Sequence, residues 1–176
     1  MNKAVFLDRD GTINVDKGYV YKKEDLEFLP NAVNGLKNIQ QLGFKLIIIT
    51  NQSGIGKGYY SEKEYRIFMN ELYKKLGEKG VKIEADYYCK HAPEKKCSCR
   101  KPNTKMIENA VKAHWIDKPN SYFIGDKTAD ILAGKNARLR TILVLTGKAG
   151  KDGKYQIKPD YICRNLKEAS QIIEKS

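Results

Sequence analysis

Two aspartates directly follow the first apolar run of the chain. Residues 4–7 are apolar and few enough for one buried strand, and Asp8, Asp10 and Gly11 come next. Acidic side chains at the carboxyl end of such a strand lie where open α/β sheets bind ligands. Asp8 could attack phosphorus as a nucleophile, while Asp10 could protonate the leaving oxygen and later take a proton from water. Because two carboxylates repel a phosphate, this chemistry requires a divalent cation.

The same D-x-D-G spacing also opens calcium-binding loops. A calcium loop supplies oxygen ligands as far as a glutamate at its twelfth position, and that position is Tyr19 in this chain. The spacing therefore favours a catalytic pair of acids over a calcium site.

Other side chains suited to phosphate chemistry are distant in the sequence. Thr50 and Asp126 each follow an apolar strand-like run, and Lys101 follows a cysteine-containing loop. Because the carboxyl ends of parallel strands meet at one edge of a sheet, we expect these residues to lie beside Asp8. Thr50 and Asn51 would donate hydrogen bonds to phosphate oxygens. Lys101 would offset charge at phosphorus, and Asp126 would add a third carboxylate for the metal.

Positioning these residues requires alternating strands and helices. Apolar runs predict strands at 4–7, 44–49, 83–89, 121–125 and 141–145, and an edge strand at 161–162. Helical spacing predicts helices at 31–42, 61–76, 104–114, 128–137 and 165–174. This alternation predicts a doubly wound, mostly parallel α/β sheet. With no repeat and no long linker, residues 1–176 are expected to form a single domain.

Caps and connections complete the predicted framework. Asn31 and Asn165 are expected to cap helices, and Ser61 with Glu64 has the pattern of a capping box. Three connections are predicted to be irregular: a flap or hairpin at 14–30, a flexible glycine loop at 54–58 and a mobile, lysine-rich loop at 146–159.

Three of the four cysteines cluster with a histidine in one loop. Cys89, His91, Cys97 and Cys99 supply three thiolates and one imidazole, which is the donor set of a closed structural zinc site. Zn²⁺ would order a loop that otherwise lacks a core. The alternatives are unrelated reduced thiols or a redox pair, and a disulfide across one intervening residue is strained. Cys163 is expected to be a small buried residue, and His114 a packing or capping residue.

The composition limits the kinds of partner that the protein could bind. The net charge of +12 suits an anionic partner, either a phosphorylated metabolite or nucleic acid, but scattered lysines equally suit a solvated surface. No apolar run reaches the roughly 18 residues of a membrane span, and a strand begins almost at the N-terminus, which argues against a signal peptide. We therefore expect a cytoplasmic protein with no membrane partner.

Four motifs in order resemble the haloacid dehalogenase superfamily of phosphohydrolases. They are residues 8–12, Thr50-Asn51, Lys101, and Gly125-Asp126-Lys127 with Asp130, in a resemblance covering about residues 3–147. The resemblance implies a Rossmann-like fold and an aspartyl-phosphate on Asp8, with Asp10 as acid and base. It also implies Mg²⁺ held by Asp8, Asp126 and the backbone carbonyl of Asp10. The gaps between motifs leave no room for an inserted cap domain, so the site should be open.

The cysteine loop narrows this resemblance to one branch of the superfamily. Residues 6–16, 18–20, 50–55 and 99–102 look like those of the D-glycero-D-manno-heptose 1,7-bisphosphate 7-phosphatases, and less closely like the related histidinol-phosphate phosphatases. The resemblance implies Mg²⁺ and structural Zn²⁺ as cofactors. It also implies that substrate is held by Asn51, Gln52, Ser53, Arg100 and Lys127. A second phosphate on the substrate would give Arg100 and Lys127 an anion to bind.

The activity implied is hydrolysis of the C7 phosphate of heptose bisphosphate by a monomer, in the synthesis of nucleotide-activated heptose for lipopolysaccharide or another glycan. The preferred anomer stays open. Histidinol-phosphate phosphatase activity is the enzymatic alternative. A nucleic-acid end phosphatase would need a concentrated basic stripe with interleaved aromatics, which the sequence lacks, so no nucleic-acid partner is expected. A zinc-stabilised binding module is disfavoured because every catalytic residue type is present.

Overall fold

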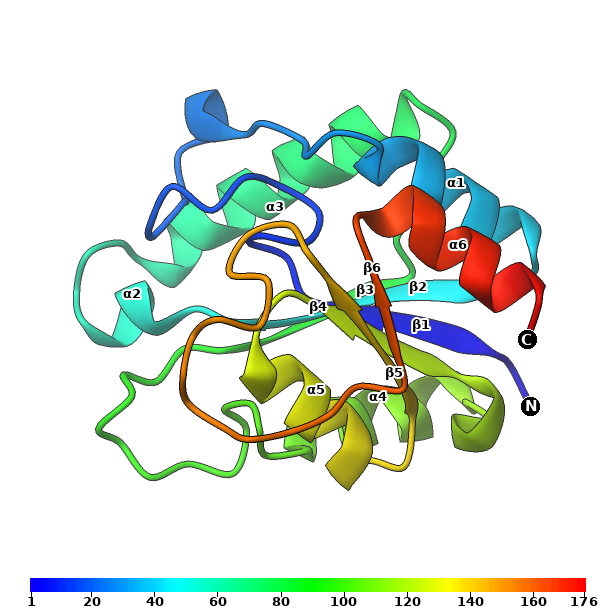
Figure 1. Ribbon diagram of the computed structural model, residues 1–176. Helices are drawn as coiled ribbons and strands as arrows, with labels where there is room; N and C mark the ends of the chain where they lie inside the picture. The colour runs from blue at the N-terminus through cyan, green and yellow to red at the C-terminus, as the bar shows by residue number, and fades with distance from the viewer.

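Six strands form one sheet in which every pair of neighbours runs parallel. In this computed structural model, which describes residues 1–176, the strand order is β3-β2-β1-β4-β5-β6 (Figure 1). The bounds are β1 (Ala4–Leu7), β2 (Lys45–Asn51), β3 (Ala85–Cys89), β4 (Tyr122–Gly125), β5 (Arg140–Val144) and β6 (Tyr161–Cys163). The chain builds outward from β1 to β3 and then returns to β1 through β4. The carboxyl ends of β1 and β4 therefore form the topological switch point, where such sheets bind ligands.

Helices cover both faces of the sheet, as the alternation in the sequence predicted. One layer contains α1 (Ala32–Gln41), α3 (Glu62–Gly77) and α6 (Leu166–Glu174), and the other contains α4 (Lys105–His114) and α5 (Thr128–Asn136) (Figure 1). The doubly wound fold without an inserted cap domain is therefore confirmed, and the sheet is entirely rather than mostly parallel. No helix in the chain combines the length and the apolar character needed to cross a membrane.

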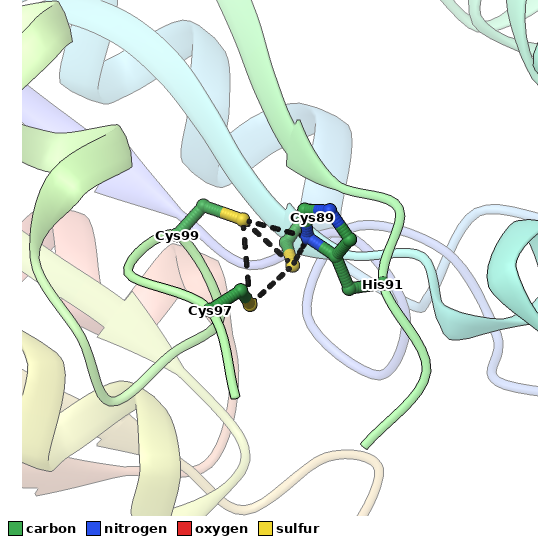
Figure 2. A group of neighbouring side chains, drawn as sticks. All are labelled: Cys89, His91, Cys97 and Cys99. Carbon is green, nitrogen blue, oxygen red and sulfur yellow. Dashed lines mark hydrogen bonds between the residues drawn. The ribbon is translucent and has the colours of Figure 1, made fainter. Parts of the chain in front are cut away.

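The predicted glycine loop after β2 contains a helical turn, α2 (Ser53–Gly56). A Cβ at Gly54 would lie 2.1 Å from the Tyr60 ring, and one at Gly56 would lie 2.5 Å from the backbone nitrogen of Ala92. These glycines therefore allow close packing against neighbouring segments, which corrects the expectation of a flexible loop. Ala92 belongs to the loop after β3, whose cysteine and histidine side chains point toward one another (Figure 2).

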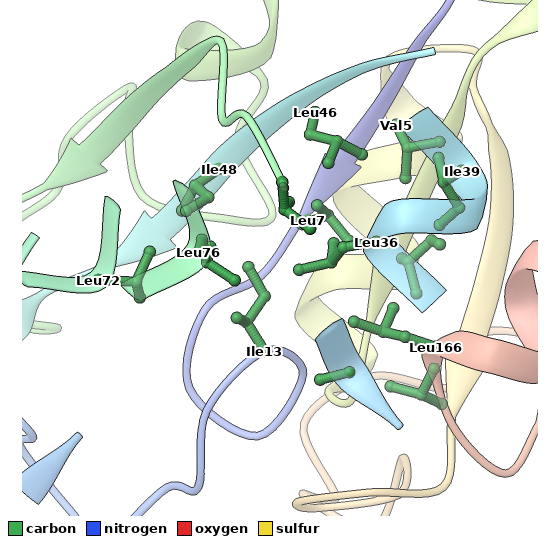
Figure 3. Packing of buried hydrophobic residues seen from close by; sticks show 14 of the residues in the cluster. Val5, Leu7, Ile13, Leu36, Ile39, Leu46, Ile48, Leu72, Leu76 and Leu166 are labelled. Carbon is green, nitrogen blue, oxygen red and sulfur yellow. The ribbon is translucent and has the colours of Figure 1, made fainter. Parts of the chain in front are cut away.

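The two helix layers bury alternate residues of the central strands. Val5 and Leu7 of β1 contact the core beneath α1, α3 and α6 (Figure 3), whereas Ala4 and Phe6 contact the core beneath α4 and α5. A strand buried on both faces needs apolar residues at every position. This explains why the strands are continuous apolar runs in the sequence rather than alternating ones.

Two of the three predicted helix caps form. Ser61 and Glu64 make a reciprocal capping box at α3, and the Asn165 side chain accepts hydrogen bonds from the first turn of α6. The prediction for Asn31 is wrong, because its side chain makes no capping hydrogen bond to α1. Asn31 adopts a left-handed backbone conformation (φ 64°), which asparagine tolerates better than most residues. It thus serves as a turn residue at the entrance to the helix.

We predict that Gly35→Ala will destabilise the fold. Gly35 lies where α1 packs on α6, and an added Cβ would lie 2.3 Å from the backbone carbonyl carbon of Leu166. The two helices would have to separate, at a cost of about 1–3 kcal/mol in the free energy of unfolding. Urea denaturation followed by circular dichroism measures this change.

Gly77→Ala is the matched control, because Gly77 ends α3 and a Cβ there would meet nothing within 4 Å. It should leave stability unchanged or raise it by up to about 1 kcal/mol. Equal midpoints for the two variants would contradict the tight α1–α6 contact.

Candidate active site

A buried ion cluster lies at the carboxyl end of β1. Lys101 Nζ donates to Asp8 Oδ1 at 2.9 Å and to the carbonyl oxygen of Ile49 at 2.7 Å. The same ammonium lies 2.7 Å from Asp130 Oδ1. Its three N–H groups thus each have a partner. Because Asp8, Asp130 and Lys101 are all buried, each charge depends on the others for the interactions that it would otherwise make with water.

The electrostatics of this cluster keep Asp8 ionised. Burial by itself would raise the pKa of Asp8, but the ammonium groups of Lys101 and Lys127 outweigh that effect and lower the pKa to about 2. Burial likewise opposes the charge on Lys101, yet Asp130 and Asp8 raise its pKa above the ordinary value. Asp8 is therefore a carboxylate at neutral pH, the form in which it can act as a nucleophile.

Asp10 is fixed by hydrogen-bond donors on several sides. The guanidinium of Arg9 contacts both of its carboxylate oxygens at 2.8 Å, while Asn14 Nδ2 and Gln52 Nε2 donate at 3.0 and 3.1 Å. Arg9 is itself fully buried, and it packs over the Phe68 ring. The Asp10 side chain keeps 15% of its surface exposed and lines the pocket described below. Its carboxylate is thus held in one orientation but accessible to a substrate.

The predicted phosphate-binding residues at the carboxyl end of β2 lie beside these acids. Thr50 Oγ1 accepts a hydrogen bond from Gln52 Nε2 at 2.8 Å, and Gln52 Oε1 accepts one from Tyr60 at 2.6 Å. The Asn51 side chain accepts from the backbone nitrogen of Lys101 at 3.0 Å and donates to its carbonyl oxygen at 3.3 Å. Asn51 and Gln52 thus hold neighbouring site residues in place, a function that the sequence pattern did not indicate.

Asp126 and Asp130 follow β4 and approach the cluster from its other side. Asp126 Oδ2 accepts from the backbone nitrogen of Lys148 at 2.7 Å, whereas Asp126 Oδ1 is buried without any hydrogen-bond partner. Burial, followed by repulsion from Asp8, raises the pKa of Asp126 to about 8. An unpartnered buried oxygen next to other carboxylates indicates a position for a cation.

Several oxygens converge on such a cation position. The carboxylates of Asp8, Asp126 and Asp130 approach within 4.8 Å of one another. The Lys127 ammonium lies 3.5 Å from Asp8 Oδ2, 3.2 Å from the backbone oxygen of Asp10 and 3.7 Å from Asp126 Oδ1. These are the three groups that the sequence resemblance implied as Mg²⁺ ligands, and a positive charge already lies among them. Hard oxygen donors in this arrangement fit a divalent cation.

A pocket of about 580 Å³ opens over this centre. It is lined by all the predicted catalytic and substrate-binding residues: Asp8, Asp10, Thr50, Asn51, Gln52, Ser53, Arg100, Lys101 and Lys127. Asp126 lies beneath it, fully buried. The structure thus brings together residues from four distant parts of the sequence. We predicted this because the carboxyl ends of parallel strands meet at one edge of a sheet.

Two residues of the centre had little or no assigned role in the sequence analysis. The sequence did not indicate a role for Arg9 in the site, because a fully buried arginine is rare and because its partner, Asp10, is the adjacent residue. Asp130 was noted only as part of the fourth motif. Its position four residues after Asp126 places it in the first turn of α5, where it reaches Lys101.

The four predicted zinc ligands form a compact cluster after β3 (Figure 2). The Cys97 sulfur lies 3.6 Å from those of Cys89 and Cys99, which are 3.0 Å apart. His91 Nδ1 lies 3.2 Å from the Cys99 sulfur and 3.6 Å from that of Cys89. Ligands in a tetrahedral zinc site are about 3.6–3.8 Å apart, given the usual bond lengths. The donor set and most of these spacings therefore fit Zn²⁺.

The remaining cysteine and histidine lie away from both clusters. Cys163 is buried at the end of β6, as predicted, and no cysteine forms a disulfide, including Cys97 and Cys99. His114 contacts the hydroxyl of Tyr87 at 3.3 Å, consistent with a packing residue.

Comparisons with known proteins agree with this geometry. Residues 98–169 match the family model described as HAD-hydrolase-like. The chain is 46% identical to the D-glycero-beta-D-manno-heptose-1,7-bisphosphate 7-phosphatase of Helicobacter pylori strain J99, over 95% of this chain and 94% of the relative. It is 38% identical to the enzyme of the same name from Pasteurella multocida, over 99% and 98% of the two chains.

A solved structure confirms the fold. The D,D-heptose 1,7-bisphosphate phosphatase from B. bronchiseptica, complexed with magnesium and phosphate, aligns with a TM-score of 0.90 over 99% of both chains, at 24% identity. The chain therefore belongs to the haloacid dehalogenase superfamily of hydrolases and is a phosphatase. Its nearly full-length relatives place it in the heptose 1,7-bisphosphate 7-phosphatase family of that superfamily, which confirms the resemblance found in the motifs.

We predict that Lys101→Met will destabilise the protein by about 3–5 kcal/mol, because it leaves the buried carboxylates of Asp8 and Asp130 without their shared cation. Chemical denaturation measures the change. Adding Asp130→Asn should restore part of the loss by removing one unpaired charge.

The control for Lys101→Met is Lys112→Met on the exposed side of α4, where Lys112 makes no ion pair. It should change stability by less than about 0.5 kcal/mol. A Lys101→Met protein as stable as this control would contradict a buried, mutually dependent ion cluster.

Proposed function

We propose that this protein removes the C7 phosphate of D-glycero-D-manno-heptose 1,7-bisphosphate and leaves the 1-phosphate on the sugar. The observation that carries the proposal is the ionised Asp8 carboxylate, held against Lys101 and open to a pocket large enough for a sugar phosphate. The names of the relatives supply the substrate class. We propose that the whole chain acts as one phosphatase domain.

The chemistry follows in two displacements. The Asp8 carboxylate attacks the phosphorus of the C7 phosphate, the bond from phosphorus to the sugar oxygen breaks, and Asp10, which must enter this step protonated, gives that oxygen its proton. Water then attacks the phosphorus of the aspartyl phosphate while Asp10 takes its proton. The bond to Asp8 breaks, inorganic phosphate leaves, and both carboxyl groups return to their starting states.

The surrounding residues orient these groups. Lys101 offsets negative charge next to the attacking oxygen of Asp8, and Thr50 presents its hydroxyl to the phosphate oxygens. Arg9 and Gln52 keep the Asp10 carboxylate facing the reacting bond. Because these contacts exist before substrate arrives, little reorganisation is needed at the moment of reaction.

Asp8, Asp126 and the backbone carbonyl of Asp10 would hold Mg²⁺, which would neutralise charge on the phosphate and the carboxylates. The unpartnered Asp126 Oδ1 and the Lys127 ammonium among these three oxygens support this assignment. The Lys148 backbone nitrogen fixes the other Asp126 oxygen, so that the carboxylate is oriented by the protein alone.

Relatives also support a choice of anomer. Four relatives that match at least 95% of the chain, from Helicobacter pylori, Pasteurella multocida and Haemophilus influenzae, bear names specific to the β anomer, whereas an α-named relative from Photorhabdus laumondii is 46% identical over 82% of it. We therefore expect the β anomer to be preferred.

The substrate assignment predicts a ranking of phosphate esters. With Mg²⁺ present, phosphate should be released from the β bisphosphate with a kcat/KM exceeding that for histidinol phosphate by at least about 100-fold, because a site with donors for sugar hydroxyls and two phosphates rejects an imidazole. Phosphate release from the α bisphosphate, the β bisphosphate and histidinol phosphate measures this.

Asp8→Asn is the control for that comparison, since it should keep the fold, with Lys101 still paired to Asp130, and release no phosphate. A reversed substrate ranking would contradict the assignment, and a fully active Asp8→Asn protein would contradict the covalent mechanism.

We further propose that Cys89, His91, Cys97 and Cys99 hold one structural Zn²⁺. The protein should contain one zinc per chain by elemental analysis, and Cys99→Ser should lose it, since a three-ligand set binds zinc far more weakly. Thermal unfolding should then occur at a lower temperature. Cys163→Ser, outside the cluster, should retain the metal; equal zinc content in both variants would argue against the site.

A further inference from the structure

A lysine-rich loop forms part of the wall of the active-site pocket. The segment between β5 and β6 contributes Lys148, Lys151 and Lys154 to the pocket lining, and the cysteine loop contributes Arg100. Lys158, in the same segment, does not line the pocket. Within this loop, the lysines that reach the pocket are thus confined to residues 148–154, although lysines are scattered over the surface as a whole.

This loop is attached directly to the catalytic centre. The backbone nitrogens of Lys148 and Gly150 donate to Asp126 Oδ2 and to its carbonyl oxygen, each at 2.7 Å. Asp152 accepts hydrogen bonds from the backbone nitrogen and the hydroxyl of Thr128, both at 2.8 Å. Lys151 and Lys154, which lie before and after Asp152 in the sequence, are therefore held next to the first turn of α5 and beside the pocket.

The loop lysines differ from the lysines at the floor of the pocket in having no acidic partner. Lys101 and Lys127 form ion pairs with the buried aspartates. Lys151, Lys154 and Arg100 form none within 4.0 Å of a carboxylate. Lys127, which the resemblance implied as a substrate-binding residue, lines the pocket but is paired with Asp8, Asp16 and Asp126, so the unpaired positive charge of the pocket wall belongs to other residues.

We propose that Lys151 and Lys154 extend the subsite for the phosphate that is not hydrolysed, a subsite in which the sequence resemblance already implied Arg100. This inference rests on the proposed function, in which the substrate carries two phosphates. A guanidinium binds a phosphate through a planar pair of N–H donors, and ammonium groups on flexible stems complete the neutralisation. The subsite would let the enzyme distinguish a sugar bisphosphate from the corresponding monophosphate.

The test compares two substrates and three forms of the Mg²⁺-loaded enzyme. Wild type, the double variant Lys151→Ala/Lys154→Ala and the control Lys158→Ala are assayed with heptose 1,7-bisphosphate and with heptose 7-phosphate, which lacks the distal phosphate. The double variant should lose about 10- to 100-fold in kcat/KM for the bisphosphate, mostly through KM, because charged hydrogen bonds to the distal phosphate are lost. Its kcat/KM for the monophosphate should stay within about twofold, and Lys158→Ala should match wild type on both.

Each alternative outcome has a separate meaning. If wild type uses the two sugars equally well, or if the double variant loses the same factor on both, the subsite is refuted while the proposed function stands. If the double variant matches wild type on the bisphosphate, the lysines do not bind its phosphate. If wild type releases phosphate from neither sugar but does so from other esters, the proposed function fails, and the subsite fails with it.

Discussion

The central constraint of this protein is the burial of a lysine between two aspartates. Lys101 lies on a loop and reaches the carboxyl end of β1, where its ammonium is shared by Asp8 and Asp130 and by the carbonyl of Ile49. Such a group of charges is tolerated in a protein interior only when its geometry satisfies every donor. The same contacts keep the Asp8 carboxylate ionised and oriented beside the pocket.

Many other features of the structure serve this arrangement. Asn51 binds both backbone groups of Lys101, and the cysteine cluster ends one residue before Arg100, so the approach of Lys101 is fixed from both sides. The parallel sheet brings β1 and β4 together at their carboxyl ends, which places Asp8 beside Asp126. Stability and reactivity therefore rely on the same few contacts, so that changes at the site are expected to affect both.

The sequence predicted the fold and most of the centre because the relevant signals are local. Buried parallel strands are continuous apolar runs, and the polar residue after each run is necessarily at the ligand-binding edge, which is how Asp8, Thr50 and Asp126 could be found. Lys101 was a weaker prediction from the strand pattern, since it follows the cysteine loop and not an apolar run, and the family motif supported it. Ser61 with Glu64 was predictable because a capping box involves residues three apart.

The features that escaped prediction depend on contacts between distant segments or on backbone conformation. Nothing near Asp152 in the sequence indicates that it binds the first turn of α5. The left-handed conformation of Asn31 is decided by the turn before α1, not by its side chain. Likewise, the inward direction of Lys127 follows from the carboxylates of Asp8 and Asp126 and the backbone oxygen of Asp10, which are brought together only in the folded chain.

The hydrogen bonds from the loop after β5 to Asp126 also bear on how the protein is made. During synthesis, a chain that has emerged from the ribosome only to the end of β4 lacks Asp126, Lys127 and Asp130, three charged residues of the centre, and also the Lys148 backbone nitrogen that binds Asp126. Domains are completed as their last elements become available. The candidate active site is therefore completed late, and a chain truncated before Asp126 would present Asp8 and Lys101 without those three charged residues of the centre.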